Sequence, residues 1–167
     1  GATERTGFAD AAGAVTYTSR IPRPRDGHET DRLLALAGVF SGRPERPSLG
    51  LTAADRAAAD EWLRERGIPP GFVALAPGSI WGTKRWPYYP ELAAALGAPI
   101  VVVGGGDDAA LGIEVITAAE GRSWNAAGEL GLRASAALLE RASVLVTNDS
   151  APLHFAAAMG TPVVAIF

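Results

Sequence analysis

Short apolar runs alternate with helical patterns from residue 72 to residue 167, and this alternation limits the fold more than any other feature of the sequence. The apolar runs have the length of buried strands and lie at residues 72–76, 100–103, 144–146 and 162–167, with a weaker one at 124–127. Segments with helical spacing separate them, at residues 89–96, 108–119 and 133–141 and in a stretch that ends at Met159. The pattern predicts an α/β fold with an open, mostly parallel sheet and helices on both faces.

The N-terminal part of the chain is less regular. Residues 15–18 have its best strand pattern. A helix is expected to begin at His28 or Glu29, because apolar residues recur at helical spacing from there to Phe40.

A domain boundary is expected near residue 50. Residues 41–49 are rich in Pro and Gly, which is typical of a linker. Thr52, with the acidic Asp55 three positions later, then has the signature of a helix N-terminus.

Polar loops follow three of the predicted strands, after Ala76, Val103 and Val146. Ligands of open α/β sheets bind beyond the carboxyl ends of the strands. These three loops are therefore the expected place for a binding site.

The loop after Val146 has the pattern of a strand, a polar turn and a helix start. Asp149 or Ser150 can cap the helix, and its open N–H groups, including that of Ala151, can bind a phosphate. Pro152 suits an early helical position, and His154 projects from the same turn. The alternative is a capped strand-to-helix junction with a half-buried histidine and no ligand.

The loop after Ala76 contains small, hydroxyl and basic residues. Gly78 allows close approach of a ligand to the backbone, Ser79 offers a hydroxyl, and Lys84 and Arg85 supply the positive charge that a diphosphate requires. The spacing does not fit a Walker A loop. The alternative is a surface loop with solvated charges.

The loop after Val103 superficially matches the dinucleotide-binding pattern Gly-x-Gly-x-x-Ala. Asp107 and Asp108, however, occupy the place where a pyrophosphate would lie, which disfavours a nicotinamide-dependent oxidoreductase. We expect a tight turn that presents a carboxylate, such as that of Asp107, to ribose hydroxyls. A turn in which an aspartate caps the next helix is the alternative.

Charge and composition exclude several classes of function. The formal net charge is −3 and the pI is about 5.4, so the chain has no basic surplus for general nucleic-acid binding. It has no cysteine and two distant histidines, and we expect neither a metal site nor a cofactor. No apolar run is long enough to span a membrane. The chain begins with Gly1 and stops inside an apolar run, so we expect it to be a piece of a longer protein.

Four motifs, in this order, resemble those of the bacterial lipopolysaccharide heptosyltransferases of glycosyltransferase family 9. They are the segments 77–79, 84–87, 104–107 and 148–154, and the last is the most specific. The resemblance implies the C-terminal, Rossmann-like domain of a two-domain GT-B enzyme. Residues 1–50 would be the tail of the N-terminal acceptor domain with a linker, and residues 51–167 a C-terminal nucleotide-sugar-binding domain that lacks its end.

The resemblance also implies a donor, ADP-heptose, and an acceptor, the inner core of lipopolysaccharide. Lys84 and Asp149 correspond to catalytic residues. The substrate-binding set implied is Gly78, Ser79, Lys84, Arg85, Asp107, Asp149, Ser150, Ala151 and His154. Ala151 and Pro152 replace a Gly-Leu or Gly-Met pair of the family, and Pro152 has no amide to donate. The family's general base is an acidic residue of the N-terminal half and lies outside this chain.

The implied reaction is an inverting transfer in the cytoplasm, either in solution or at the cytoplasmic face of the inner membrane. Two alternatives stay open. The chain could be a catalytically inactive module that binds a nucleotide or nucleotide-sugar, or it could belong to a glycosyltransferase of the same family that uses another sugar.

Overall fold

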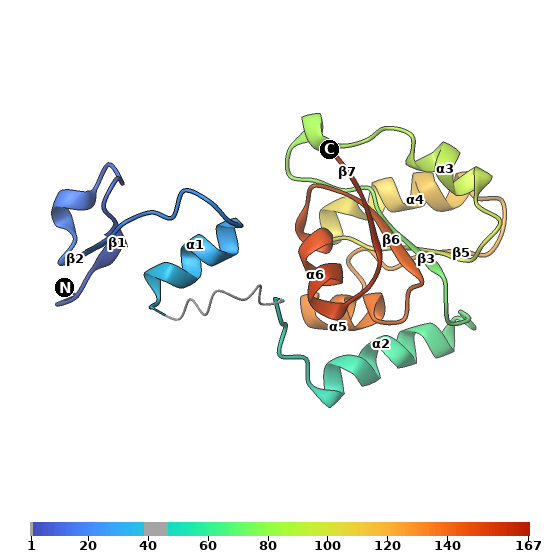
Figure 1. Ribbon diagram of the computed structural model, residues 1–167. Coiled ribbons are helices and arrows are strands. Elements are labelled where there is room, and N and C mark those ends of the chain that lie inside the picture. Colours follow the sequence, from blue (N-terminus) through green and yellow to red (C-terminus); the bar gives the residue numbers. More distant parts are fainter. Residues whose placement is uncertain (1, 39–46) are drawn as a thin grey trace. The chain divides into compact units, whose positions relative to one another are not determined.

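The computed structural model describes residues 2–38 and 47–167, which fall into two compact units, Gly1–Glu45 and Arg46–Phe167 (Figure 1). Whether the first unit is the tail of an acceptor domain stays a prediction.

The first unit contains a two-stranded parallel sheet, formed by β1 (Thr6–Phe8) and β2 (Ser19–Ile21). The strand predicted at residues 15–18 is wrong. Residues Ala14–Thr16 form a 3₁₀ turn, in which the backbone N–H and the hydroxyl of Thr16 both donate to the Gly13 carbonyl. These local bonds use the polar groups that a strand would offer to a neighbour, and the strand begins at Ser19 instead.

The helix predicted to begin at His28 or Glu29 is α1 (Glu29–Leu36). His28 is its N-cap and accepts a hydrogen bond from the Thr30 N–H, while the Asp31 carboxylate accepts one from the His28 N–H. Phe40 and residues 41–46 of the predicted linker lie outside the described residues.

The second unit is built on five parallel strands in the order β5-β4-β3-β6-β7. The strands are β3 (Val73–Ala76), β4 (Ile100–Val102), β5 (Ser123–Asn125), β6 (Val144–Asn148) and β7 (Val163–Ile166). The helices between and before them are α2 (Ala53–Glu65), α3 (Tyr89–Ala95), α4 (Ala109–Ala118), α5 (Leu132–Leu139) and α6 (Ala151–Met159). The predicted alternation and the predicted parallel α/β sheet are confirmed.

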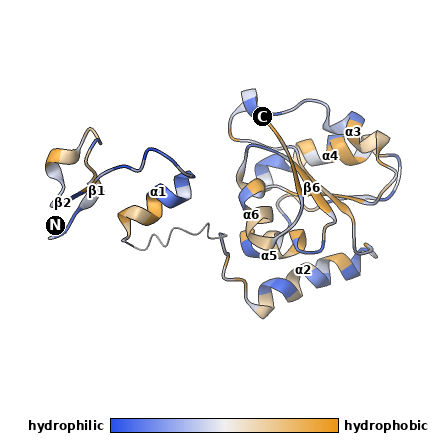
Figure 2. Ribbon diagram, viewed as in Figure 1, coloured by the Kyte–Doolittle hydropathy of each residue, from blue (hydrophilic) through white to orange (hydrophobic). Residues whose placement is uncertain are grey.

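Two apolar cores lie on opposite faces of this sheet because side chains alternate along each strand. Residues such as Ala74 and Val101 pack against α2, α5 and α6, whereas their neighbours Leu75 and Val102 pack against α3 and α4. Figure 2 shows apolar residues along the strands and more hydrophilic residues along α2. Both faces of the sheet are thus covered, and the ends of the strands are left to carry polar residues.

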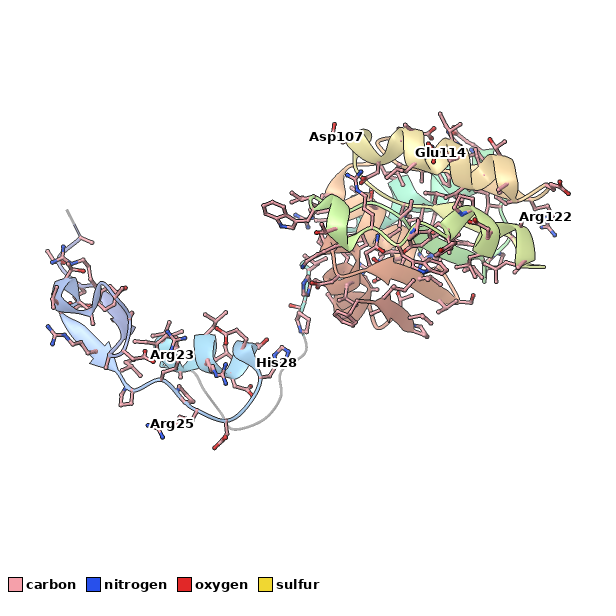
Figure 3. All side chains as sticks on the ribbon, turned by 90° about the horizontal axis from the view of Figure 1, so that it is seen from above. Arg23, Arg25, His28, Asp107, Glu114 and Arg122 are labelled. Carbon is pink, nitrogen blue, oxygen red and sulfur yellow. The ribbon has the colours of Figure 1, made fainter. Side chains whose placement is uncertain are left out.

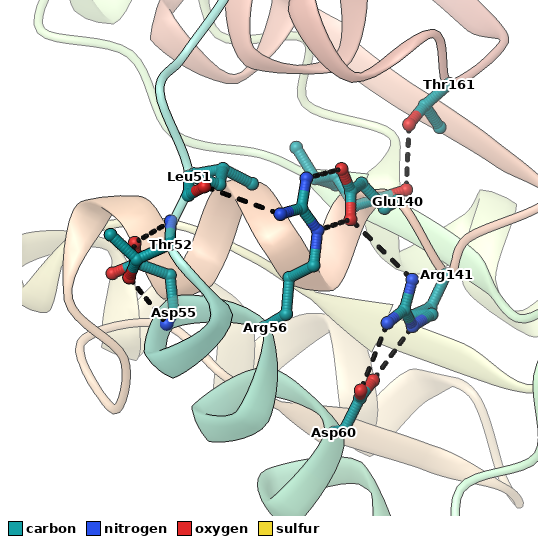
Figure 4. Close-up of polar contacts among 9 residues, drawn as sticks. Leu51, Thr52, Asp55, Arg56, Asp60, Glu140, Arg141 and Thr161 are labelled. Atoms are coloured by element: carbon teal, nitrogen blue, oxygen red, sulfur yellow. Dashed lines mark hydrogen bonds and ion pairs between the residues drawn. The ribbon is translucent and has the colours of Figure 1, made fainter.

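Ion pairs fasten α2 to the C-terminal end of α5 (Figure 4). Arg56 makes two bonds of 2.9 Å to the Glu140 carboxylate, and Arg141 makes two bonds of 2.8 and 3.0 Å to Asp60. Paired contacts of this kind fix orientation as well as distance. They hold α2 along the face of the sheet.

Replacing Thr52 by alanine is expected to destabilise the second unit by about 1 kcal/mol. Thr52 is the N-cap of α2, where its hydroxyl accepts from the Asp55 N–H and the Asp55 carboxylate accepts from the Thr52 N–H. Urea unfolding of the 167-residue chain measures the change. Thr117→Ala is the matched control, because among the described residues that hydroxyl bonds only to a carbonyl within α4. An unchanged midpoint in Thr52→Ala would contradict the assigned cap.

Candidate functional site

The loops that carry most of the predicted site residues leave the sheet where the strand order reverses. The chain runs outward from β3 to β4 and β5, and then returns to the other side of β3 to form β6 and β7. The loops after the neighbouring strands β3 and β6 therefore diverge from one point, which is the usual ligand position in such sheets. Two of the three predicted loops, those after β3 and β6, thus meet where the strand order reverses, which we call the switch point. The third loop follows β4, which is the other neighbour of β3 in the sheet.

Lys84 and Asp149 form an ion pair across this point, with 2.5 Å between Lys84 Nζ and Asp149 Oδ2. Lys84 lies in a short 3₁₀ turn, Gly82–Lys84, within the β3–α3 loop (residues 77–88), and Asp149 directly follows β6. The two side chains are 45% and 37% exposed, so a ligand can reach both. Lys84 is also the only lysine among the 15 lysine and arginine residues of the chain. The structure thus brings together the two residues predicted to be catalytic.

The Lys84 ammonium holds the pKa of the Asp149 carboxyl below its ordinary value, and His154 adds to the lowering. His154 is exposed and lies in the first turns of α6, as predicted from its spacing. Asp149 is therefore ionised at neutral pH and is a poor proton acceptor.

In a Lys84→Gln variant we expect the pKa of Asp149 to rise toward its ordinary value. Lys84 pairs only with the ionised carboxylate, so the pKa is lower in the folded than in the unfolded chain. The stabilisation by this pair is present above the unfolded-state pKa and is lost as the pH falls through the folded-state pKa. Carboxyl ¹³C NMR measures the titration. Asp55, whose pKa is lowered chiefly by Thr52, should not change and serves as the internal control.

The start of α6 lies directly after Asp149. Of the two predicted capping residues, Ser150 is the N-cap of α6, but its side chain makes no capping hydrogen bond to the helix. The Ser150 hydroxyl turns back instead, 3.3 Å from the Thr147 hydroxyl and 3.4 Å from the Asn148 carbonyl. The Leu153 N–H donates to the Ser150 carbonyl.

Pro152 lies in the first turn of α6 and has no N–H. Because Leu153 is also engaged, the amides left to face an anion are those of Ser150 and Ala151, at the positive end of the helix. This is fewer than a helix start usually offers. The positive charge of Lys84 accordingly matters more for any anion bound here.

Arg85 stabilises the β3–α3 loop through a hydrogen bond to the backbone of the same loop. Its Nε donates to the Ser79 carbonyl at 2.9 Å, and the backbone N–H of Lys84 donates to the Trp81 carbonyl at 2.9 Å. Ser79 itself is buried. The structure therefore shows Arg85 holding the loop, and contact of Arg85 and Ser79 with a substrate stays a prediction.

Gly78 is packed against the loop after β4. A Cβ atom on Gly78 would lie 2.1 Å from Asp108 Oδ1, so the group that approaches Gly78 here is a carboxylate of the protein itself. Asp108 Oδ2 accepts from the Gly105 N–H at 2.9 Å and closes the 3₁₀ turn Gly106–Asp108 before α4. Asp108 is the N-cap residue of α4 by position, but its side chain makes no capping hydrogen bond to that helix, so the alternative of an aspartate that caps the next helix is not confirmed.

Asp107 lies at the N-terminal end of α4 with its side chain on the outside (Figure 3). It is exposed, whereas Asp108 is half-buried. Its contact with a ribose stays a prediction. In the described part of the chain, no group of three or more His, Asp or Glu side chains has the geometry to hold a metal ion.

Asn148 is the residue of this site whose role the sequence did not predict. It is completely buried, and its side chain contacts four partners: the carbonyls of Pro77 and Gly78, the Trp86 N–H and the Tyr89 hydroxyl. One signal existed, since an asparagine at the end of an apolar strand must satisfy its amide when it is buried. The partners could not be identified, because all of them lie about 60 to 70 residues away.

The fold and the site define a doubly wound α/β domain with an ion pair and a helix start at its switch point. A sequence profile of glycosyltransferase family 9 (heptosyltransferase) matches residues 1–167, and the chain belongs to this family. The family predicted from the four motifs is confirmed.

Lipopolysaccharide heptosyltransferase 2 of Salmonella typhimurium is 37% identical over 105 residues, which cover 57% of this chain and 30% of that protein. The glycosyltransferase family 9 structure from Veillonella parvula is 26% identical, with a TM-score of 0.82 over 98% of this chain and 50% of that one. The structure of ADP-heptose LPS heptosyltransferase II from Escherichia coli is also 26% identical, with a TM-score of 0.74 over 99% and 56% of the two chains. The chain thus spans about a third of the length of its curated relatives, and the GT-B type of fold is confirmed.

No helix in the described ranges combines the length and the apolar character needed to cross a membrane.

Proposed function

We propose that the complete protein is an inverting glycosyltransferase that moves heptose from ADP-heptose to the inner core of lipopolysaccharide, and that residues 51–167 supply the donor site. The observation that carries this proposal is the Lys84–Asp149 pair, placed at the switch point beside the open amides of α6. The names of the relatives support the substrates, because they specify ADP-heptose and lipopolysaccharide.

In the proposed reaction, a hydroxyl oxygen of the acceptor attacks the anomeric carbon of the heptose. The bond from that carbon to the diphosphate oxygen breaks, ADP leaves with the electron pair, and the proton of the acceptor passes to a base. Negative charge grows on the diphosphate as the bond breaks. An ammonium group has three donors, so Lys84 can bind a phosphate oxygen while it still contacts Asp149, and the amides of Ser150 and Ala151 add to the stabilisation.

The base is proposed to be an acidic residue elsewhere in the complete protein. Asp149 does not suit that role because Lys84 lowers its pKa. We assign to Asp149 the positioning of Lys84 and contact with hydroxyls of the sugar. Residues 1–50 are proposed to belong to the acceptor domain, and the transfer is placed in the cytoplasm, at the face of the inner membrane that presents the acceptor.

Calorimetric titration of the 167-residue chain and of the complete protein with ADP and ADP-heptose, together with a transfer assay on the complete protein, tests the proposal. We expect saturable binding of both nucleotides and transfer of heptose by the complete protein. Failure of the complete protein to bind either nucleotide would overturn the donor site. Binding without transfer would favour an inactive module, and faster transfer from another ADP-linked sugar would assign a different donor within the family.

A further inference from the structure

We infer that Asn148 is a positioning residue: its buried amide clamps both ends of the β3–α3 loop and thereby sets the contact between Lys84 and Asp149. The functional consequence rests on the proposed role of these two residues at the donor site, but the structural claim does not. Asn148 contacts neither the ammonium nor the carboxylate, so it acts through the loop and through its own place in the chain directly before Asp149.

The position of Asn148 follows from where the ladder between β3 and β6 stops. The last paired residues are Ala76 and Thr147, and the chain then continues as Pro77 on one side and Asn148 on the other. The backbone of Asn148 stays in the sheet on its other side, where it pairs with Ile166 of β7. Strand pairing therefore holds the backbone of Asn148, while its side chain reaches the β3–α3 loop where that loop leaves the sheet. Asn148 Nδ2 donates to the Pro77 carbonyl at 2.9 Å, which replaces the ladder bond that is absent there.

Every hydrogen-bonding position of the Asn148 amide is used. Its nitrogen also lies 3.4 Å from the Gly78 carbonyl, and its oxygen accepts from the Trp86 N–H at 3.1 Å and the Tyr89 hydroxyl at 3.4 Å. Burial raises the pKa of Tyr89, so its hydroxyl keeps the proton that it donates. An amide offers two donors and two lone pairs, and these four contacts use all of them.

The four partners enclose the loop that carries Lys84. Pro77 and Gly78 are its first residues, and Trp86 and Tyr89 lie at its other end, where α3 begins. The Trp86 and Tyr89 rings contact each other edge to face, with 5.3 Å between their centroids, which stiffens this end. Lys84 is two residues from Trp86. One side chain therefore ties the segment that presents the ammonium to the residue that precedes the carboxylate.

The test uses the ligand-free 167-residue chain and its single lysine. Selective ¹⁵N-lysine labelling yields one Nζ resonance, which reports Lys84 alone, and carboxyl ¹³C NMR reports the pKa of Asp149. In Asn148→Ala and Asn148→Leu, we expect the pKa of Asp149 to rise toward its ordinary value. The Nζ resonance should move to the position that it has in Asp149→Asn, in which the pair is absent.

Leu145→Ala is the matched control. Leu145 is a completely buried residue of the same strand, but it packs in the apolar core and not against the loop. Its truncation should lower the unfolding midpoint and leave both NMR signals unchanged, which separates positioning from a general loss of stability. Tyr89→Phe removes only one of the four contacts and keeps the core filled, so it should give a smaller rise in the pKa of Asp149 even if the Asn148 variants do not fold.

An unchanged Asp149 pKa in every folded variant would overturn the inference, and so would an equal rise in Leu145→Ala. Neither result depends on a nucleotide. Failure of the wild-type protein to bind ADP-heptose would instead overturn the proposed function and leave the positioning role standing.

Discussion

Replacing Lys84 by alanine in the complete protein is expected to lower the rate of heptose transfer by about 10²- to 10³-fold, the usual loss when one preorganised group that stabilises developing charge is removed. Lys84 is the charged hydrogen-bond donor at the switch point, and the amides of Ser150 and Ala151 are the neutral donors beside it. Because Lys84 is nearly half-exposed and does not pack in either apolar core, its removal should leave the fold intact.

Arg64→Ala is the matched control for this prediction. Arg64 is an exposed base on α2 that pairs with Glu61 and lies outside the loops at the switch point. Its removal should leave transfer unchanged. Lys84→Arg keeps the charge but changes the compact ammonium to a planar fork, so we expect only partial activity. Near-normal transfer by a folded Lys84→Ala variant would contradict the assignment.

Replacing Gly78 by alanine is expected to destabilise the second unit by about 1–3 kcal/mol, the usual cost of forcing an extra methyl group into a packed site. The added Cβ would lie 2.1 Å from the Asp108 carboxylate, which in turn accepts the Gly105 N–H. Either the loop after β3 or the turn after β4 must therefore move. Because the moved loop carries Lys84, weaker binding of ADP should accompany the loss of stability.

Gly82→Ala is the control in the same loop, because a Cβ atom at Gly82 would meet none of the described residues within 4 Å outside its two chain neighbours and its own 3₁₀ turn. Its unfolding midpoint should match that of the wild type. Asp108→Ala should relieve the clash, so the double variant with Gly78→Ala should lose less stability than the two single variants together. Additive losses in this cycle, measured by urea unfolding, would show that Asp108 is not the group that restricts Gly78.

Much of the fold could be predicted from the sequence because local patterns determine it. The apolar runs of β3, β4 and β6 and the cap at Thr52 depend on residues within one element. The wrong strand prediction at residues 15–18 also has a local cause. The Thr16 hydroxyl bonds to the nearby Gly13 carbonyl, and bonding of this kind competes with strand formation.

The site could be predicted only in part. The motifs identified Lys84 and Asp149, and the alternation of strands and helices implied that their loops meet. The sequence could not show that Asp108 rather than a ligand contacts Gly78, nor that Asn148 is bonded to both ends of a distant loop. Such contacts depend on the register of neighbouring strands and on side-chain orientation, which periodicity does not determine.

The most direct test of the central claim, that Lys84 binds the diphosphate of a nucleotide-sugar, is a titration of its single ¹⁵N-labelled Nζ resonance. ADP-heptose and ADP should each shift this resonance in a saturable way, and adenosine, which has no phosphate, should leave it unchanged at the same concentrations. A resonance that does not respond to ADP-heptose or ADP when calorimetry shows both to be bound would contradict the claim.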